Sequence, residues 1–281
     1  MPTPDTIILV HGLWMTPLCW EHWIERYTAR GHRVLAPAWP GIPELGGDIE
    51  AFRRDPSGLA ALGIAEIVDH YESIIRGLDR PPIIMGHSYG GLFTQILVDR
   101  GLGAAGVAID SAPVKGILLL PFSTLRVAWP ALSNPFNYHQ VGGLTAEEFH
   151  YAFGNLLSDA ESRRVYERYA VPGPDHVLFQ GGLANFNPHS PAAVNFFNAD
   201  RAPLLLIAGG KDHIVPASVT RANFNLYRKS KAITDYKEFP ERSHYTLGEP
   251  GWEEVADYAL DWASRNAAEP RRQSVVQAAS A

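Results

Sequence analysis

The chain has 281 residues, of which 46% are hydrophobic and 19% charged, which is enough apolar material for one large folded domain. Its formal net charge of −6 argues against nucleic acid or an anionic membrane surface as the main partner. Cys19 is the only cysteine, so an intramolecular disulfide is excluded and a reducing compartment is the expected one.

The sequence carries no recognisable targeting or membrane-spanning segment. It begins with Met-Pro-Thr-Pro-Asp instead of a basic stretch followed by an apolar one, so no signal peptide is expected. No apolar run reaches the ~18–20 residues that span a bilayer. We therefore expect a cytoplasmic protein that acts on a small molecule, has no nucleic-acid or membrane partner, and is a monomer or homodimer.

Short apolar runs alternate with helical patterns along much of the chain. The run Thr6–Val10 lacks polar alternation, which is typical of a strand covered on both faces. Further strands are predicted over 32–37, 83–85, 103–110, 202–208 and 232–239, and helices over 18–30, 57–78, 92–98, 217–227 and 252–266. Residues 44–56 are predicted to be loop. The alternation predicts an α/β fold with a mostly parallel sheet flanked by helices.

This rhythm breaks over residues 115–200, which hold many aromatic and helix-forming residues but no convincing buried strand. Thr145 and Glu148 have the spacing of a capping box, which predicts a helix starting there. We therefore predict a helical cap at 115–200, inserted between two late strands of a core formed by 1–114 and 201–268. Residues 269–281 are predicted to be a flexible tail.

The segment Gly86-His-Ser88-Tyr-Gly90 follows one predicted strand and opens a predicted helix. This is the G-x-S-x-G pattern of a nucleophile elbow. The glycines remove side chains that would collide with the neighbouring strand and helix in so tight a turn. Ser88 would then stand at the N-terminus of a helix, whose dipole favours developing negative charge. The pattern predicts Ser88 as a nucleophile.

An acid and a base are predicted at the ends of later strands, where ligands collect in open parallel sheets. Asp212 follows the strand at 202–208, and His244 follows the last strand. The order Ser88, Asp212, His244 is the one that accompanies a nucleophile elbow. Asp110 also ends a predicted strand, so it is an alternative for the acid. No His spacing typical of a zinc site occurs, so no metal is expected.

Oxyanion donors and substrate contacts are predicted more indirectly. The backbone N–H of Tyr89, directly after the nucleophile, is one expected oxyanion donor, and that of Leu13 in the turn at 11–14 is the other. His11 is interpreted as a structural histidine. The expected apolar substrate contacts are aromatic residues of this turn and of the cap, namely Trp14, Phe122, Trp129, Phe153 and Phe186.

Four short segments together resemble the α/β-hydrolase superfamily over about residues 5–265. They are Leu-Val-His-Gly-Leu at 9–13, Gly-His-Ser-Tyr-Gly-Gly at 86–91, Ala-Gly-Gly-Lys-Asp-His-Ile-Val-Pro at 208–216 and Ser-His at 243–244. The resemblance implies a sheet of about six to eight strands, a triad without metal or organic cofactor, and a cap that shapes the pocket. The turn His-Gly-Leu-Trp departs from the glycine-rich turn of many lipases and esterases.

The leading functional hypothesis is a serine hydrolase that cleaves a small to medium, largely apolar ester, lactone or thioester through an acyl-enzyme. The same triad could instead serve C–C bond hydrolysis, perhydrolysis or cyanohydrin cleavage. Plant-type hydroxynitrile lyases of this fold have a lysine beside the catalytic histidine, where this chain has Tyr245. A ligand receptor that retains a triad is the alternative from another class.

Overall fold

The computed structural model describes residues 4–267. Its centre is a six-stranded sheet with the order β2-β1-β3-β4-β7-β8, in which every neighbouring pair is parallel. The strands are β1 (Thr6–Val10), β2 (Arg33–Leu35), β3 (Ile83–His87), β4 (Ala105–Ile109), β7 (Leu204–Gly209) and β8 (Thr234–Phe239). Every residue of the four inner strands is buried, as the continuous apolar runs predicted, whereas most residues of the edge strands β2 and β8 are partly exposed.

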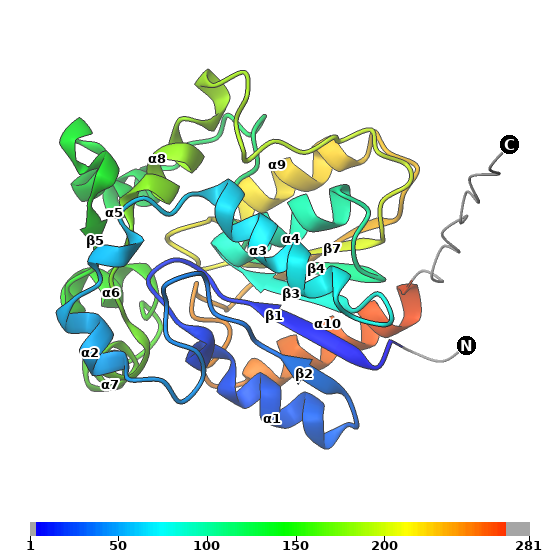
Figure 1. The fold of residues 1–281 in the computed structure, drawn as a ribbon, viewed down its shortest axis with the longest axis horizontal. Coiled ribbons are helices and arrows are strands. Elements are labelled where there is room, and N and C mark those ends of the chain that lie inside the picture. The colour runs from blue at the N-terminus through cyan, green and yellow to red at the C-terminus, as the bar shows by residue number, and fades with distance from the viewer. Residues whose placement is uncertain (1–3, 268–281) are drawn as a thin grey trace, which may run out of the picture.

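Helices cover both faces of this sheet (Figure 1). They are α1 (Glu21–Ala29), preceded by the short η1 (Pro17–Trp20), α3 (Ile64–Arg76), α4 (Tyr89–Asp99), α9 (Ala217–Tyr227) and α10 (Trp252–Asn266). α3, α4 and α9 lie on one face, and α1 and α10 lie on the other. The hydroxyl of Tyr27 on α1 donates to the carbonyl of Ala256 on α10 at 2.7 Å, which joins the two helices of the second layer.

The predicted cap segment, residues 115–200, leaves the sheet after β4 and returns at β7, its neighbour in the sheet. It contains α5 (Phe122–Leu132), η3 (Pro135–His139), β5 (Val141–Gly142), α6 (Ala146–Ala152), α7 (Asp159–Tyr169), β6 (Gly173–Pro174), α8 (Asp175–Gly182) and η4 (Ala184–Phe186). In Figure 1 these helices gather at the end of the molecule away from both termini. Thr145 and Glu148 form the predicted capping box of α6.

Three local predictions differ from the structure. The predicted loop at 44–56 contains α2 (Ile49–Arg54), whose N-cap Asp48 accepts from the N–H of Ala51 at 2.8 Å. The helix predicted over 57–78 is divided into η2 (Ser57–Leu59) and α3. The segment predicted to have no buried strand contains β5 and β6, which pair with each other over two residues. Such short elements are set by tertiary contacts, because so few residues carry little periodic signal.

Two further predictions concern a C-terminal tail and membrane-spanning segments. Residues 269–281, predicted to be a flexible tail, lie outside the described residues. Within residues 4–267, no helix combines the length and the hydropathy that crossing a bilayer requires.

Candidate active site

Ser88 occupies a strained turn between β3 and α4. Its backbone has φ 56° and ψ −121°, a left-handed conformation that non-glycine residues rarely adopt. The Ser88 N–H donates to the carbonyl of Ile109 at 2.9 Å, and the Ser88 carbonyl accepts from the N–H of Ala112 at 2.9 Å. These bonds to β4 and the residues after it hold the serine in its strained conformation. The side chain is nearly enclosed, with the residue only 6% exposed.

Two glycines permit the close packing around this turn. A Cβ on Gly90 would lie 2.0 Å from the carbonyl oxygen of Val10, so α4 could not approach β1 if a side chain were present. A Cβ on Gly12 would lie 2.8 Å from Cβ of Ser88 and 3.0 Å from the carbonyl oxygen of His87. The turn after β1 is therefore pressed against the predicted nucleophile, and Gly12 is a site residue that was not singled out from the sequence.

His244 and Asp212 are joined by a buried hydrogen bond. Nδ1 of His244 lies 2.6 Å from Oδ2 of Asp212, and neither side chain is exposed to solvent. The other carboxylate oxygen of Asp212 accepts from the N–H groups of Ile214 and Val215 at 2.6 and 2.9 Å. The ring of Phe153 packs edge-on against the imidazole, with ring centroids 4.9 Å apart. The carboxylate and the aromatic ring together fix the orientation of the imidazole.

The other ring nitrogen of His244, Nε2, has no hydrogen-bond partner among the described residues, Ser88 included. His87 connects the serine turn to the histidine loop, because its Nε2 lies 2.8 Å from the carbonyl oxygen of His244. The two imidazole rings lie 4.6 Å apart. Burial lowers the pKa of His87 well below its usual range, so this ring is neutral and donates from Nε2. Catalytic hydrogen bonds are often long without substrate and tighten when it binds.

Asp110, the alternative acid, lies close by but does not hold the histidine. Its Oδ1 accepts from the N–H of Gly209 at 2.6 Å, and its Oδ2 has no partner among residues 4–267. Its backbone has φ 44°, in the left-handed region. Complete burial and the neighbouring charge of Asp212 raise the pKa of Asp110 well above its usual range. Since His244 Nδ1 is engaged by Asp212, the geometry favours Asp212 as the orienting acid.

A second buried carboxylate supports the histidine loop. Glu249 accepts from the N–H of Ser243 at 3.0 Å and from the Ser243 hydroxyl at 2.6 Å. Burial raises the pKa of this carboxyl. Ser243 precedes the predicted base, so the Glu249 bonds fix the backbone that carries His244. The sequence offered no signal for this role beyond the nearness of the two residues.

One group of side chains has metal-ligand chemistry. His87, Asp110 and His244 each offer an atom within 4.8 Å of the others, and all three are buried. Each also already makes a hydrogen bond through one of its polar atoms, to the carbonyl of His244, the N–H of Gly209 and the carboxylate of Asp212 respectively. These bonds orient the side chains toward protein partners, which suits a hydrogen-bonded triad better than a metal centre.

The two predicted oxyanion donors belong to the turns that meet at Ser88, because Gly12 packs against Ser88 and Tyr89 follows it. Tyr89 is the first residue of α4, so its N–H has no carbonyl one turn earlier in the helix. Leu13 follows Gly12, and no described backbone carbonyl accepts from its N–H. His11 supports this turn, since its Nδ1 lies 2.9 Å from the Gly12 carbonyl and its Nε2 accepts from the N–H of Trp39 at 3.2 Å. Burial lowers the pKa of His11 to about 4, so it stays neutral.

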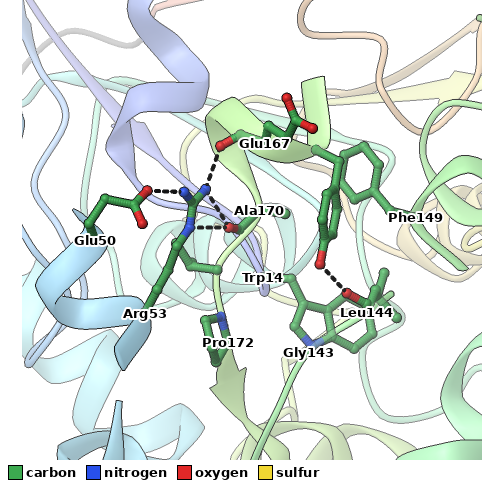
Figure 2. Close-up of a pocket in the computed structure, with 11 residues that line it drawn as sticks. Trp14, Glu50, Arg53, Gly143, Leu144, Phe149, Glu167, Ala170 and Pro172 are labelled. Carbon is green, nitrogen blue, oxygen red and sulfur yellow. Dashed lines mark hydrogen bonds and ion pairs between the residues drawn. The ribbon is translucent and has the colours of Figure 1, made fainter. Parts of the chain in front are cut away.

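Trp14 lines two cavities, each of which is also bordered by residues of the cap segment. The first, about 490 Å³, lies between α2, α6 and α7, and Trp14, Phe149 and Leu144 form part of its wall (Figure 2). At its rim, Arg53 donates to the carbonyl oxygens of Ala170 and Glu167 and to the Glu50 carboxylate. The second, about 480 Å³, also contacts Trp14 and Leu144 and extends along α5 and η3. Trp14 itself has φ 64°.

The aromatic residues predicted to contact substrate fall into two groups. Trp14 lines both cavities, and Phe153 packs on His244. Phe122, Trp129 and Phe186 instead are 81%, 63% and 84% exposed and line neither cavity. Aromatic content alone could not tell which face of a cap helix turns inward. The cavity residues missed from the sequence include Arg53, Phe149 and Tyr166, and the first lies on the unpredicted helix α2.

Comparison with known proteins shows which protein family the chain resembles. Residues 7–258 match the sequence profile described as "Alpha/beta hydrolase family". The chain is 25% identical over 288 residues to a monoacylglycerol lipase of Mycolicibacterium smegmatis, covering 92% of this chain and 90% of that protein.

Solved structures resemble the fold as a whole. A monoacylglycerol lipase from Paleococcus ferrophilus has a TM-score of 0.62 at 22% identity, with 95% of this chain and 97% of that chain covered. A pyrethroid hydrolase from Sphingobium faniae has a TM-score of 0.64 at 19% identity, with 93% and 98% covered. The profile match confirms the predicted family and fold class. The chain belongs to the alpha/beta hydrolase family.

Proposed function

We propose that the protein is a carboxylic ester hydrolase with Ser88 as nucleophile, His244 as base and Asp212 as orienting acid. The observation that carries this proposal is the 2.6 Å bond between His244 Nδ1 and Asp212 Oδ2, which leaves Nε2 as the free ring nitrogen. A base oriented by a carboxylate, beside a serine in a strained turn at a helix N-terminus, is the arrangement that acyl transfer requires.

The proposed reaction uses each group at a stated atom. His244 Nε2 removes the proton of the Ser88 hydroxyl as Oγ attacks the ester carbonyl. The backbone N–H groups of Tyr89 and Leu13 then donate to the oxyanion, and Asp212 stabilises the charged imidazolium. Nε2 next protonates the leaving alkoxide, which leaves as an alcohol. A water molecule, deprotonated by the same nitrogen, attacks the acyl-enzyme; the bond between the acyl carbon and Ser88 Oγ breaks, Nε2 returns the proton to Oγ, and the acid is released.

The first cavity beside Trp14 supports an apolar acyl chain of medium length as part of the substrate. The 490 Å³ cavity lies within the ~300–1,000 Å³ range of small-molecule sites, and Leu144, Phe149 and Val171 contribute to its wall. Glu50 and Arg53 are ion-paired with each other at its rim, so they offer no unpaired charge for an ionic substrate. The M. smegmatis and P. ferrophilus relatives are named monoacylglycerol lipases, which makes a monoacylglycerol the first natural ester to assay.

A fluorophosphonate probe tests the proposal most directly. We expect labelling of the wild-type protein at Ser88, mapped by peptide mass spectrometry, together with hydrolysis of p-nitrophenyl esters and of 1-monoacylglycerols. Ser88→Ala should lose labelling and at least about 10³-fold in kcat. Ser73→Ala, a matched change at an exposed serine of α3, should retain both. Undiminished turnover in Ser88→Ala would refute the mechanism. Tight binding of an ester without turnover would instead favour a receptor.

A further inference from the structure

The second cavity, of about 480 Å³, has carboxylates in its wall and no basic side chain. It is bordered by α5, η3, β5 and the start of α8. The described residues that line it include Asp175 and Glu148 but no Lys, Arg or His. The amide side chains of Asn137 and Gln140 add further acceptor oxygens. The polar part of this wall therefore carries negative charge that no basic side chain of the wall balances.

Asp175 is the buried carboxylate of this wall. The residue is only 4% exposed, and its carboxylate makes no hydrogen bond or ion pair with any described residue. Oδ1 lies over Gly142, since a Cβ on that glycine would be 2.7 Å from it. Burial raises the pKa of Asp175 to about 6, so the carboxyl is mostly ionised at pH 8. Burying a carboxylate is costly unless the charge is paired or hydrogen-bonded, and a cation in the cavity would supply that partner.

The position of Asp175 as the first residue of α8 does not by itself explain its burial. A carboxylate in the first turn of a helix is favoured by the helix dipole. Asp159 has the same position in α7, but its side chain is 99% exposed and lies 3.5 Å from Nε2 of His150. The dipole favours both carboxylates equally, so the enclosure of Asp175 against the cavity needs another reason.

The basic side chains of the bordering elements point to other partners. The guanidinium of Arg126, the basic residue of α5, lies 3.8 Å from the centroid of the Tyr151 ring. Nε2 of His176 on α8 lies 2.9 Å from the hydroxyl oxygen of Tyr138, and His139 packs on the same ring. None of these three basic residues lines the cavity. The cavity is therefore suited to a positively charged group.

The second cavity reaches the turn that carries the predicted oxyanion donor. β6 packs on this turn, since a Cβ on Gly173 would lie 2.6 Å from Cδ1 of Leu13 and 3.4 Å from the backbone N of Trp14. Asp175 follows Gly173 by two residues, and Trp14 lines both cavities. An ester whose carbonyl lies at the Leu13 N–H would thus have the first cavity for its acyl chain and the second for its alcohol portion.

We propose that the second cavity binds an organic ammonium group, carried by the alcohol portion of the ester, with Asp175 as its counter-ion. Trp14 and Phe136 line the same cavity, and aromatic rings of this kind attract ammonium groups. The inference deepens the proposed function and rests on it for the ester bond. The binding of the cation itself does not depend on catalysis, so the two can be tested separately.

Binding is measured without turnover in the Ser88→Ala protein. Choline and its uncharged isostere 3,3-dimethyl-1-butanol are titrated at pH 8 by isothermal titration calorimetry. Choline should bind at least about tenfold more tightly, because only the cation is attracted by the carboxylate and the aromatic rings. Adding Asp175→Asn should remove this difference. Adding Asp159→Asn, the same change at the matched position of α7, should retain it.

Selectivity between two esters tests the same site in the active protein. Choline butyrate and 3,3-dimethylbutyl butyrate have the same acyl chain and nearly the same shape, and they differ by one charge. The ratio of their kcat/KM values should favour the choline ester at least about tenfold in wild type and in Asp159→Asn. In Asp175→Asn the ratio should fall to about one. A purely structural role of Asp175 would lower kcat/KM for both esters and leave the ratio unchanged.

Three outcomes would overturn the inference. The first is equal binding of choline and 3,3-dimethyl-1-butanol, or equal kcat/KM for their two butyrates. The second is a preference for choline that survives Asp175→Asn. The third is a preference for 1-monobutyrin over both esters that Asp175→Asn abolishes, since the carboxylate would then accept hydrogen bonds from hydroxyl groups. A protein that binds choline through Asp175 but hydrolyses no ester would instead support the cation site and contradict the proposed function.

Discussion

Replacing Gly12 by alanine tests whether the turn after β1 and the Ser88 turn must touch. The new Cβ would lie 2.8 Å from Cβ of Ser88 and 3.0 Å from the carbonyl oxygen of His87. Because non-bonded carbon atoms prefer ~3.5–4.0 Å, the two turns must separate by about 0.7–1.2 Å. A displacement near 1 Å costs on the order of 10²-fold in rate, and loss of one oxyanion donor costs ~10²–10³-fold. We therefore expect kcat to fall about 100-fold or more.

The assay compares kcat for p-nitrophenyl butyrate with the melting temperature of the same preparation. Overpacking costs about 1–3 kcal/mol, so Gly12→Ala should melt a few degrees lower and still fold. Gly58→Ala is the matched control, because no atom lies within 4 Å of a Cβ at that exposed position. Wild-type kcat in a folded Gly12→Ala protein would refute the proposed contact between the oxyanion turn and the nucleophile.

Three further predictions concern the two aspartates and Trp14. Asp212→Asn should lower kcat by about three to four orders of magnitude, whereas Asp110→Asn should stay within about tenfold of wild type; the reverse order would make Asp110 the acid. Burial raises the pKa of Asp110 in the folded protein above its pKa of ~3.9 in the unfolded chain. The contribution of this carboxyl to the free energy of unfolding is therefore complete below pH ~3.9 and is lost as pH rises through the pKa of the folded protein. Asp110→Asn should therefore melt above wild type at pH 7 and equally near pH 4 in thermal scans, and a constant difference would contradict this. Trp14→Ala removes a side chain that lines both cavities, so kcat/KM should rise for p-nitrophenyl esters of long acids relative to p-nitrophenyl butyrate. If the dependence of kcat/KM on acyl chain length is unchanged, Trp14 does not line the acyl site.

The core of the fold was predictable because its strands have a strong and simple signal. Thr6–Val10 and Leu204–Gly209 are apolar throughout and wholly buried, as strands covered by helices on both faces must be. The glycines at 86 and 90 marked the turn between β3 and α4, and the structure shows the backbone contacts that exclude a side chain there. Each signal is local, so a single chain carries it without any knowledge of the tertiary structure.

The cap segment was predictable only in part of its helices, and the directions of its side chains were not predictable. Capping boxes at Thr145 and Ser158 mark where α6 and α7 begin. Which aromatic residues face inward depends on how the helices pack, and Phe153 is buried while Phe122 is 81% exposed. α2 escaped prediction because its position depends on Arg53, which bonds to Ala170 more than a hundred residues away.

The choice between Asp110 and Asp212 illustrates what local pattern cannot decide. Both follow strands, and β4 and β7 are neighbours, so both carboxylates reach the same edge of the sheet. Burial raises the pKa of Asp110, and the charge of the nearby Asp212 raises it further, because two close carboxylates repel when both are ionised. Asp212 meets two backbone N–H groups and the imidazole, whereas Asp110 meets one N–H. The difference arises from the loop after β7, whose N–H groups turn toward Asp212. The loop geometry therefore selects which of the two carboxylates bonds to His244.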